Sequence, residues 1–104
     1  MIKYSQGLSA ELAQIASYLA QYNESTAERF LDHCEESFQL LERFPERGSP
    51  RRFEEPELAS IRMSLVKGFD VYLIFYIPFL GGVRILHVFH SALDYNRIVD
   101  IGDL

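Results

Sequence analysis

The sequence contains little sulfur and no tryptophan. Cys34 is the one cysteine among 104 residues, so an internal disulfide is excluded and the chain suits a reducing compartment. Because Cys34 lies among apolar residues at helical spacing, we expect a buried thiol rather than a nucleophile. No set of His, Cys, Asp and Glu residues has the spacing of metal ligands, so we predict neither a metal nor a cofactor.

Long apolar runs are also missing. Residues 1–6 (MIKYSQ) contain no apolar stretch of the length found in a signal peptide. No segment reaches the roughly 18 apolar residues that a membrane-spanning helix needs. We therefore expect a soluble, cytoplasmic protein without a membrane partner.

Basic residues are few. Ten Lys and Arg residues stand against 15 Asp and Glu residues, which gives a net charge of −5. Such a chain is poorly suited to hold nucleic acid by bulk attraction, so we expect no specific nucleic-acid binding. Residues 11–46 carry eight acids and two bases, whereas residues 60–93 carry three bases and one acid. An anionic partner would therefore meet the C-terminal part of the chain.

The chain does contain enough apolar material for one domain. Hydrophobic residues make up 48% of the sequence and aromatic residues 13%. At this length such a content is sufficient for a core, and it argues against disorder. We predict a single domain over residues 1–104.

The N-terminal half predicts a short strand followed by a helical hairpin. Residues 2–6 could pair as a strand. From Ser9, the expected N-cap, apolar residues recur at helical spacing to about residue 23. Residues 25–28 (STAE) fit a capping box that begins a second helix, which ends near Phe44. The short link makes the helices antiparallel, and a sheet must cover their remaining apolar faces.

The C-terminal half predicts an antiparallel sheet. Its three strands are expected at residues 61–65, 71–77 and 83–90. Residues 66–70 are expected to form a turn or bulge, Pro78 to end the central strand, and Gly81-Gly82 to supply the next turn. Residues 45–57, which combine prolines with charges of both signs, are expected to be a solvated connector.

The predicted order of elements is β-α-α-β-β-β. This is an α+β fold in which a helical hairpin packs on a small antiparallel sheet, with an optional short C-terminal helix over residues 91–101. A partly apolar groove between the hairpin and the sheet would accept a segment of another protein.

Polar side chains interrupt the apolar strands and the segment that follows them. They are Arg62, Arg84, His87, His90 and Asp94. Polar groups at regular positions on apolar strands indicate a surface that binds something. Strict alternation along the last strand places His87 on one face and places Arg84 and His90 on the other.

A series of short motifs and single residues is spread in order along nearly the whole chain. They are LSAEL at residues 8–12, Ile15, Tyr18, Ala27, Phe30-Leu31, Leu40-Leu41, Phe44-Pro45, Gly48, Pro56, Leu58, Ile61-Arg62, YLIFY at residues 72–76, Val83, Ile85, Val88, His90 and Asp94. Each motif alone is common, but the ordered set is specific. It resembles the ParE branch of the ParE/RelE superfamily of bacterial toxins from type II toxin–antitoxin modules.

The resemblance implies a small toxin that a cognate antitoxin keeps inactive. Members similar to this branch act on DNA gyrase and block replication, whereas relatives in the RelE branch cut mRNA on the ribosome. We favour a non-enzymatic gyrase inhibitor from a plasmid-stabilization module. Its candidate target-binding residues are Arg62, Tyr76, His87, His90 and Asp94.

Two alternatives remain open. The first is a RelE-type endoribonuclease, whose candidate catalytic residues would be Arg62, Arg84, His87, His90 and Tyr95. The second is a non-toxic relative that only binds an antitoxin. It is suggested by His87 and Leu93, because ParE-like chains often have Arg at these two positions and the changes remove permanent positive charge.

Each candidate residue also has a structural interpretation. Arg62 could pair with a glutamate on a helix face. His87 could be a hydrogen-bonded, partly buried histidine, and Tyr76 could belong to the core. His90 and Asp94 could bond to each other or cap the terminal segment.

Overall fold

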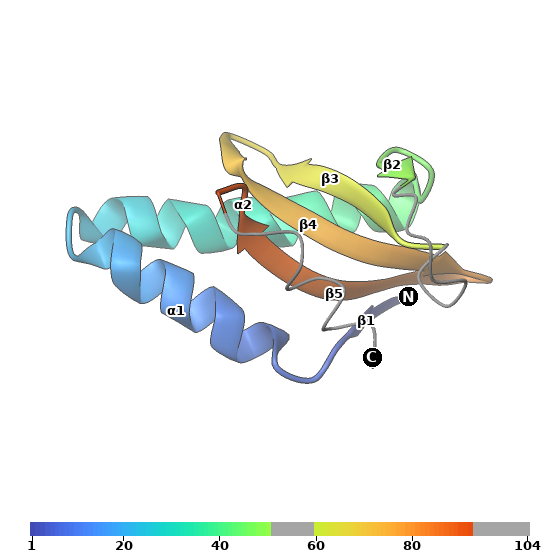
Figure 1. Cartoon of the computed structure of the whole chain (residues 1–104), viewed down its shortest axis with the longest axis horizontal. Coiled ribbons are helices and arrows are strands. Elements are labelled where there is room, and N and C mark those ends of the chain that lie inside the picture. Colours follow the sequence, from blue (N-terminus) through green and yellow to red (C-terminus); the bar gives the residue numbers. More distant parts are fainter. Residues whose placement is uncertain (51–59, 93–104) are drawn as a thin grey trace.

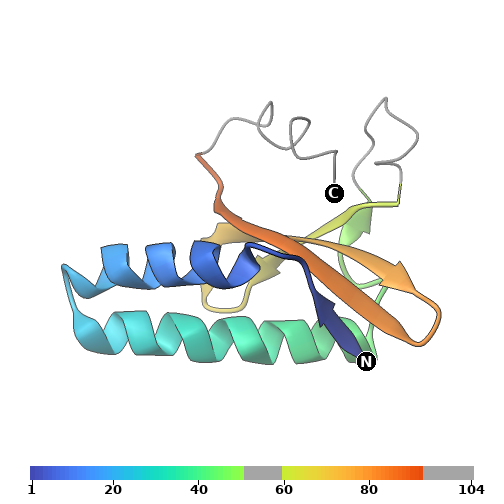
Figure 2. The same cartoon turned by 90° about the horizontal axis from the view of Figure 1, so that it is seen from below.

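A computed structural model of the chain describes residues 1–50 and 60–92. In these ranges two helices lie side by side against one face of a five-stranded sheet (Figures 1 and 2). The order β1, α1, α2, β2, β3, β4, β5 confirms the predicted α+β fold. It contains one strand more than predicted, because β2 is a two-residue strand (Ser49–Pro50) within the expected connector. The predicted C-terminal helix and most of the predicted connector lie outside the described residues.

The sheet is mixed rather than wholly antiparallel as predicted. Its strands are β1 (Ile2–Tyr4), β2 (Ser49–Pro50), β3 (Arg62–Val66), β4 (Phe69–Phe79) and β5 (Gly82–His90). Their order across the sheet is β1-β5-β4-β3-β2. The strands β2 to β5 pair antiparallel, but β1 runs parallel to β5. A parallel pair is feasible here because both helices lie between β1 and β5 in the chain, so no tight turn links them.

The helix α1 (Leu8–Ala20) begins one residue before the expected cap. Gly7 precedes it with a left-handed backbone (φ 93°), and Ser9 lies inside the helix without capping it. A non-glycine residue rarely adopts such a φ. The chain therefore enters α1 through a backbone turn rather than through a side-chain cap.

The helix α2 (Glu24–Arg43) is capped by Asn23, not by the predicted box at Ser25. The Asn23 Oδ1 atom accepts hydrogen bonds from the backbone N–H groups of Ser25 and Thr26, at 2.9 and 3.3 Å. Because Asn23 caps the second helix, α1 ends earlier than predicted, at Ala20. Asparagine is among the most favourable N-cap residues, which explains this choice.

The main core lies between the helices and the sheet. Its buried members are Leu8, Phe30, Cys34, Phe38, Leu41, Val66, Tyr72, Ile74, Tyr76, Val83, Ile85 and Val88. A second buried cluster combines Leu73 and Phe75 of β4 with Ile61 and Leu86. The central strand β4 is therefore buried on both faces, as its continuous apolar run predicted.

A bulge in β5 exchanges its two faces. Phe75 pairs with His87 and Tyr76 pairs with Ile85, so Leu86 is an extra residue on β5. Before the bulge, Arg84 lies between two helix-facing neighbours and points away from the helices. After it, His87 also points away, because its pairing partner Phe75 and its stacking neighbour Phe89 (centroids 5.1 Å apart) both belong to the second cluster, on the face without helices. Arg84 therefore shares a face with His87, and the prediction that it shares one with His90 is wrong.

Pro78 does not end β4 as predicted, because the strand continues to Phe79. Its pairing partner Val83 donates its N–H to the carbonyl oxygen of Met1, just before β1 (3.1 Å), so this N–H points away from β4. In such an antiparallel pair the nitrogen of Pro78 also points outward. The missing N–H of proline costs no hydrogen bond there, since the pairing of β3 has already ended at Tyr76.

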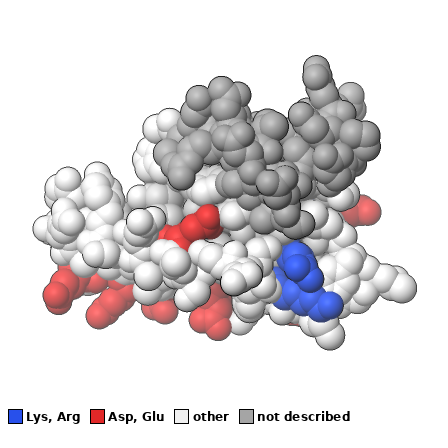
Figure 3. Space-filling model, turned by 60° about the horizontal axis from the view of Figure 1, so that its bottom comes forward, with Lys and Arg blue, Asp and Glu red and all other residues white. Residues whose placement is uncertain are grey.

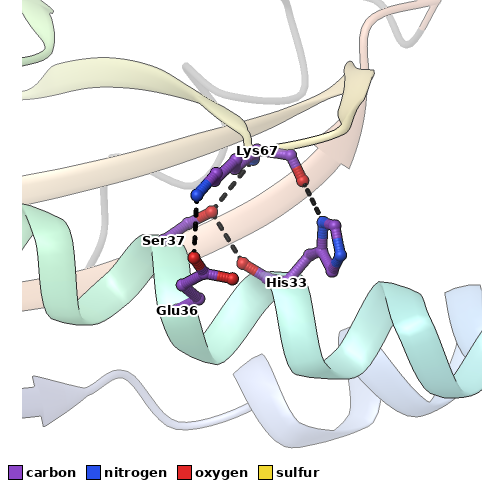
Figure 4. A network of polar contacts seen from close by, with 4 residues as sticks. All are labelled: His33, Glu36, Ser37 and Lys67. Carbon is purple, nitrogen blue, oxygen red and sulfur yellow. Dashed lines mark hydrogen bonds and ion pairs between the residues drawn. The ribbon is translucent and has the colours of Figure 1, made fainter.

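The turn between β3 and β4 is fastened to α2 (Figure 4). The Lys67 N–H donates to the Ser37 Oγ atom (2.9 Å), and the Lys67 carbonyl oxygen accepts from the His33 Nδ1 atom (2.6 Å). The Lys67 ammonium pairs with Glu36 at 2.8 Å, which lowers the pKa of this carboxyl group. This network fixes the turn between β3 and β4 on α2.

Candidate functional site

A groove of about 450 Å³ lies between α1 and the sheet. Its lining residues are Glu11, Gln14, Ile15 and Tyr18 from α1, together with Tyr72, Val88, Phe89 and His90 from the sheet. The predicted groove between hairpin and sheet is therefore present. We call it the α1–sheet groove.

Aromatic side chains form much of this groove. Tyr18 is 53% exposed on α1, and its ring packs edge-on against Tyr22 with the centroids 5.4 Å apart. On the sheet side, Tyr72 is buried, which raises its pKa, and its ring lies 5.2 Å from that of His90. Exposed tyrosine beside a rigid apolar surface is typical of protein-binding sites.

Glu11 joins α1 to β5 beside the groove. Its Oε1 atom accepts a hydrogen bond from the Val88 N–H (3.2 Å), and its Oε2 atom lies 2.6 Å from the His87 Nδ1 atom. The pairing of β1 with β5 ends at Ile85, with one further bond from the Ser5 N–H. The carboxylate of Glu11 thus replaces the strand neighbour that β5 lacks at Val88.

His87 has a structural environment. The residue is 8% exposed, its Nδ1 atom contacts Glu11, and its ring stacks on Phe89. Its Nε2 atom is buried and has no hydrogen-bond partner among the described residues. A histidine in this position is not free to exchange protons with a substrate.

Replacing Glu11 by alanine is expected to lower the free energy of unfolding by about 1–2 kcal/mol, because the Val88 N–H and the His87 Nδ1 atom lose their partner. Glu11→Gln keeps an oxygen for the Val88 N–H and should cost less. Urea denaturation of both variants measures the difference. Equal losses would show that the hydrogen bond to Val88 is not the source of the effect.

Arg62 and Tyr76 lie away from the groove and hold the loop after α2. The Tyr76 hydroxyl donates to the Pro45 carbonyl oxygen (2.7 Å) and accepts from the Gly48 N–H (2.9 Å). The Arg62 guanidinium donates to the carbonyl oxygens of Gly48 (2.9 Å) and Glu46 (3.0 Å). Arg62 thus binds backbone carbonyls rather than a helix glutamate. Tyr76 is 0% exposed, so no partner can contact it in this structure.

The remaining candidates are not brought together. Arg84 is exposed on β5 beside Lys3 of β1. His90 lines the groove, and its Nδ1 atom accepts from the Ala92 N–H (3.0 Å) in the turn directly after β5. Asp94 and Tyr95 lie outside the described residues. The structure therefore separates Arg62, Arg84 and His90.

Neither a metal site nor a membrane span is found in residues 1–50 and 60–92. No three His, Cys, Asp or Glu side chains lie together as metal ligands in these ranges. Neither of the helices described there is both long and apolar enough to cross a membrane.

A protein-family profile described as "ParE toxin of type II toxin-antitoxin system, parDE" matches residues 2–95. The chain belongs to the ParE toxin family. This confirms the resemblance deduced from the ordered motifs, and membership implies a cognate antitoxin. The search among curated proteins found no match.

A solved structure shares the fold of this ParE-family chain. It is entitled "Chromosomal ParDE TA system from P. aeruginosa" and superposes with a TM-score of 0.66. The match covers 86% of this chain and 92% of the other at 17% sequence identity. At this identity the similarity establishes the fold and nothing more specific.

Sequence reasoning missed the role of Glu11 in this ParE-family chain. The residue was expected only to favour the N-terminus of a helix. No local signal was available, because the contact depends on the parallel pairing of β1 with β5, which the sequence did not predict. Tyr18, which lines the groove, was among the motif residues, but the sequence assigned it no role.

Cys34 is buried in the core, and burial raises the pKa of its thiol to about 12. Because the thiolate is the reactive form, the native ParE-family chain should react with a thiol reagent at pH 8 far more slowly than the chain in guanidinium chloride. Absorbance of the released thiol chromophore measures both rates. Equal rates would mean that Cys34 is accessible in the folded state.

The same shift predicts a dependence of stability on pH. The unfolded thiol loses its proton near pH 8.5, whereas the folded thiol keeps it to about pH 12. The contribution of Cys34 is thus fully present below pH 8.5 and declines as the pH rises toward 12. Urea denaturation between pH 8 and 10 should show a steeper decline for the wild type than for Cys34→Ala, which has no thiol to titrate.

Proposed function

We propose that this chain is a toxin that inhibits DNA gyrase, and that a cognate antitoxin neutralises it by occupying the α1–sheet groove. Membership in the ParE family is the observation that carries this proposal. The gyrase target and the mode of neutralisation are extensions from the family to this chain.

The positions of the candidate catalytic groups favour inhibition over RNA cleavage. In-line cleavage needs a base, an acid and a cation around one phosphate. His87 is buried and bonded to Glu11, and it points to the opposite face of β5 from His90. The Arg62 guanidinium is engaged by two backbone carbonyls. These groups do not form one phosphate-binding site.

The α1–sheet groove supports the second half of the proposal. It has an apolar floor, an exposed tyrosine on one side and the open end of β5 on the other. An amphipathic helix can place apolar side chains in such a groove, and an extended segment can follow the strand edge. An antitoxin segment of either kind suits this site.

A pair of assays tests the target. Purified toxin is added to gyrase with relaxed plasmid and ATP, and in parallel to a translating extract with a reporter mRNA. The proposal predicts loss of supercoiling, intact mRNA, and recovery of supercoiling when the antitoxin is added. Cleavage of mRNA with normal supercoiling would instead identify a ribonuclease, and no effect in either assay would identify a non-toxic relative.

The groove has its own test. Replacing Tyr18 by alanine is expected to weaken antitoxin binding about 10- to 100-fold, since buried tyrosines at interface centres contribute that much. Phe44→Ala is a matched control, because Phe44 is similarly exposed (52%) at the far end of α2. Calorimetric titration measures both affinities. Equal affinities for Tyr18→Ala and the wild type would place the antitoxin elsewhere.

A further inference from the structure

The hairpin between β4 and β5 extends beyond the end of β3. The strand β3 pairs with β4 only from Phe69 to Tyr76, whereas β4 and β5 continue to pair as far as Phe79 and Gly82. Figures 1 and 2 both show this turn projecting away from the helices. We call residues 77–84 the hairpin arm.

The tip of the hairpin arm is unusually apolar. Leu80 and Gly81 form the turn, and Leu80 is fully exposed (102%). Gly81 supplies the positive φ (97°) that the turn requires. Turn positions normally carry polar residues, and Leu80 follows directly on the partly exposed residues 77–79, which are also apolar. An apolar run of this kind at a projecting tip indicates a contact site.

Two basic side chains lie together at the base of the hairpin arm, one in the arm and one on the neighbouring strand. Lys3 of β1 and Arg84 of β5 are partners in the parallel pair, and both are exposed. The Lys3 ammonium lies 5.2 Å from the centre of the Phe79 ring. Among the described residues neither base forms an ion pair with an acid. Figure 3 shows one basic cluster on this face, apart from the acidic side chains.

The hairpin arm is held next to its turn by the N-terminus. A Cβ atom at Gly82 would lie 1.9 Å from the Met1 carbonyl oxygen, so the residue before β1 packs directly against the arm. The amino group of Met1 also donates to the Gly81 carbonyl oxygen (3.0 Å). A rigid arm loses little conformational freedom on binding.

The arm and the α1–sheet groove lie at opposite ends of one hairpin. Tyr72 and His90 pair at the groove, and Phe79 and Gly82 pair next to the turn. Tyr72 and Phe79 are seven positions apart along β4, which corresponds to about 23 Å at 3.3 Å per residue. A side chain at the tip therefore cannot contribute to the groove.

We propose that the hairpin arm is the part of the toxin that contacts its protein target, with Leu80 entering an apolar pocket rimmed by carboxylates. We infer the carboxylates from Lys3 and Arg84, because two adjacent bases attract acidic groups on a partner. The rest of the chain is acidic and would repel such a partner, so the attraction is confined to the arm. This inference rests on the proposed function, and it assigns target contact and antitoxin contact to separate surfaces.

The experiment compares Leu80→Ser and Arg84→Glu with the wild type in the gyrase supercoiling assay. Each variant is expected to need at least 10-fold more toxin for half-inhibition, and wild-type inhibition should weaken as salt rises. Leu65→Ser and Arg29→Glu are the matched controls, because Leu65 is exposed (45%) on β3 and Arg29 is exposed on α2. Both controls should inhibit like the wild type.

Urea denaturation and antitoxin affinity complete the test. Both quantities should be unchanged in Leu80→Ser and Arg84→Glu, which separates a contact from a folding defect. If Leu80→Ser and Arg84→Glu reach half-inhibition within twofold of the wild-type toxin concentration, the inference is overturned and the proposed function stays intact. Weakened antitoxin binding would also overturn it, because the arm would then belong to the antitoxin interface. Wild-type toxin without effect on gyrase would refute both.

Discussion

Replacing Phe30 by alanine is expected to lower the free energy of unfolding by about 3–5 kcal/mol. Phe30 is fully buried in α2, and its ring packs against Phe69 at 5.4 Å and Tyr72 at 4.9 Å. Alanine removes this aromatic contact and leaves a cavity between the hairpin and the sheet. Domains of this size have about 5–15 kcal/mol of stability, so the variant should unfold at a clearly lower urea concentration.

Phe44→Ala is the control for this measurement. Phe44 lies at the C-cap of α2, and its ring faces the Arg43 guanidinium at 5.6 Å. Because about half of the residue is already exposed to solvent, truncation should cost less than 1 kcal/mol. A loss below 1 kcal/mol for Phe30→Ala would contradict the central position assigned to this ring.

Replacing Gly48 by alanine is expected to cost about 3 kcal/mol, the upper part of the usual range for overpacking. A Cβ atom at this position would lie 2.6 Å from the Tyr76 hydroxyl oxygen and 2.7 Å from the Met63 carbonyl oxygen. The carbonyl belongs to β3 and cannot move aside without disturbing the pairing with β2 and β4. Thermal and urea denaturation should both show the loss.

A double-mutant cycle with Tyr76→Phe identifies the cause. Alone, Tyr76→Phe should cost about 1–3 kcal/mol, because the Gly48 N–H and the Pro45 carbonyl oxygen lose their partner. In the double variant, part of the overlap with the alanine side chain at position 48 is relieved. The double variant should therefore lose less unfolding free energy than the sum of the losses in the two single variants. Strict additivity would mean that the hydroxyl contributes nothing to the clash.

These results bear on function because the Arg62–Tyr76 pair positions the loop rather than a ligand. Arg62 and Tyr76 are cross-strand partners on β3 and β4, and both reach the backbone of residues 45–48. Two polar residues that the sequence suggested as a binding surface are thus used to end α2 and return the chain to the sheet. Variants at these positions should impair folding before they impair target binding.

The candidate site could be predicted from the sequence only in part. The apolar run of β4 and the amphipathic stripe of α1 predicted a sheet, a hairpin and a groove between them. The bulge at Leu86 was not predictable, because an extra residue in β5 is visible only against its partner strand. That one residue moved Arg84 to the face of His87, and so changed which polar groups lie together.

The sequence by itself determined the α+β class, the order of the helices and of every strand except β2, and membership in the ParE family, because these depend on local periodicity and on motifs in order along the chain. Only the tertiary structure decided the parallel pairing of β1, the capture of His87 and Val88 by Glu11, and the burial of Tyr76. Each of these joins residues far apart in the chain. Such contacts depend on how the packed layers meet, and no local pattern encodes them.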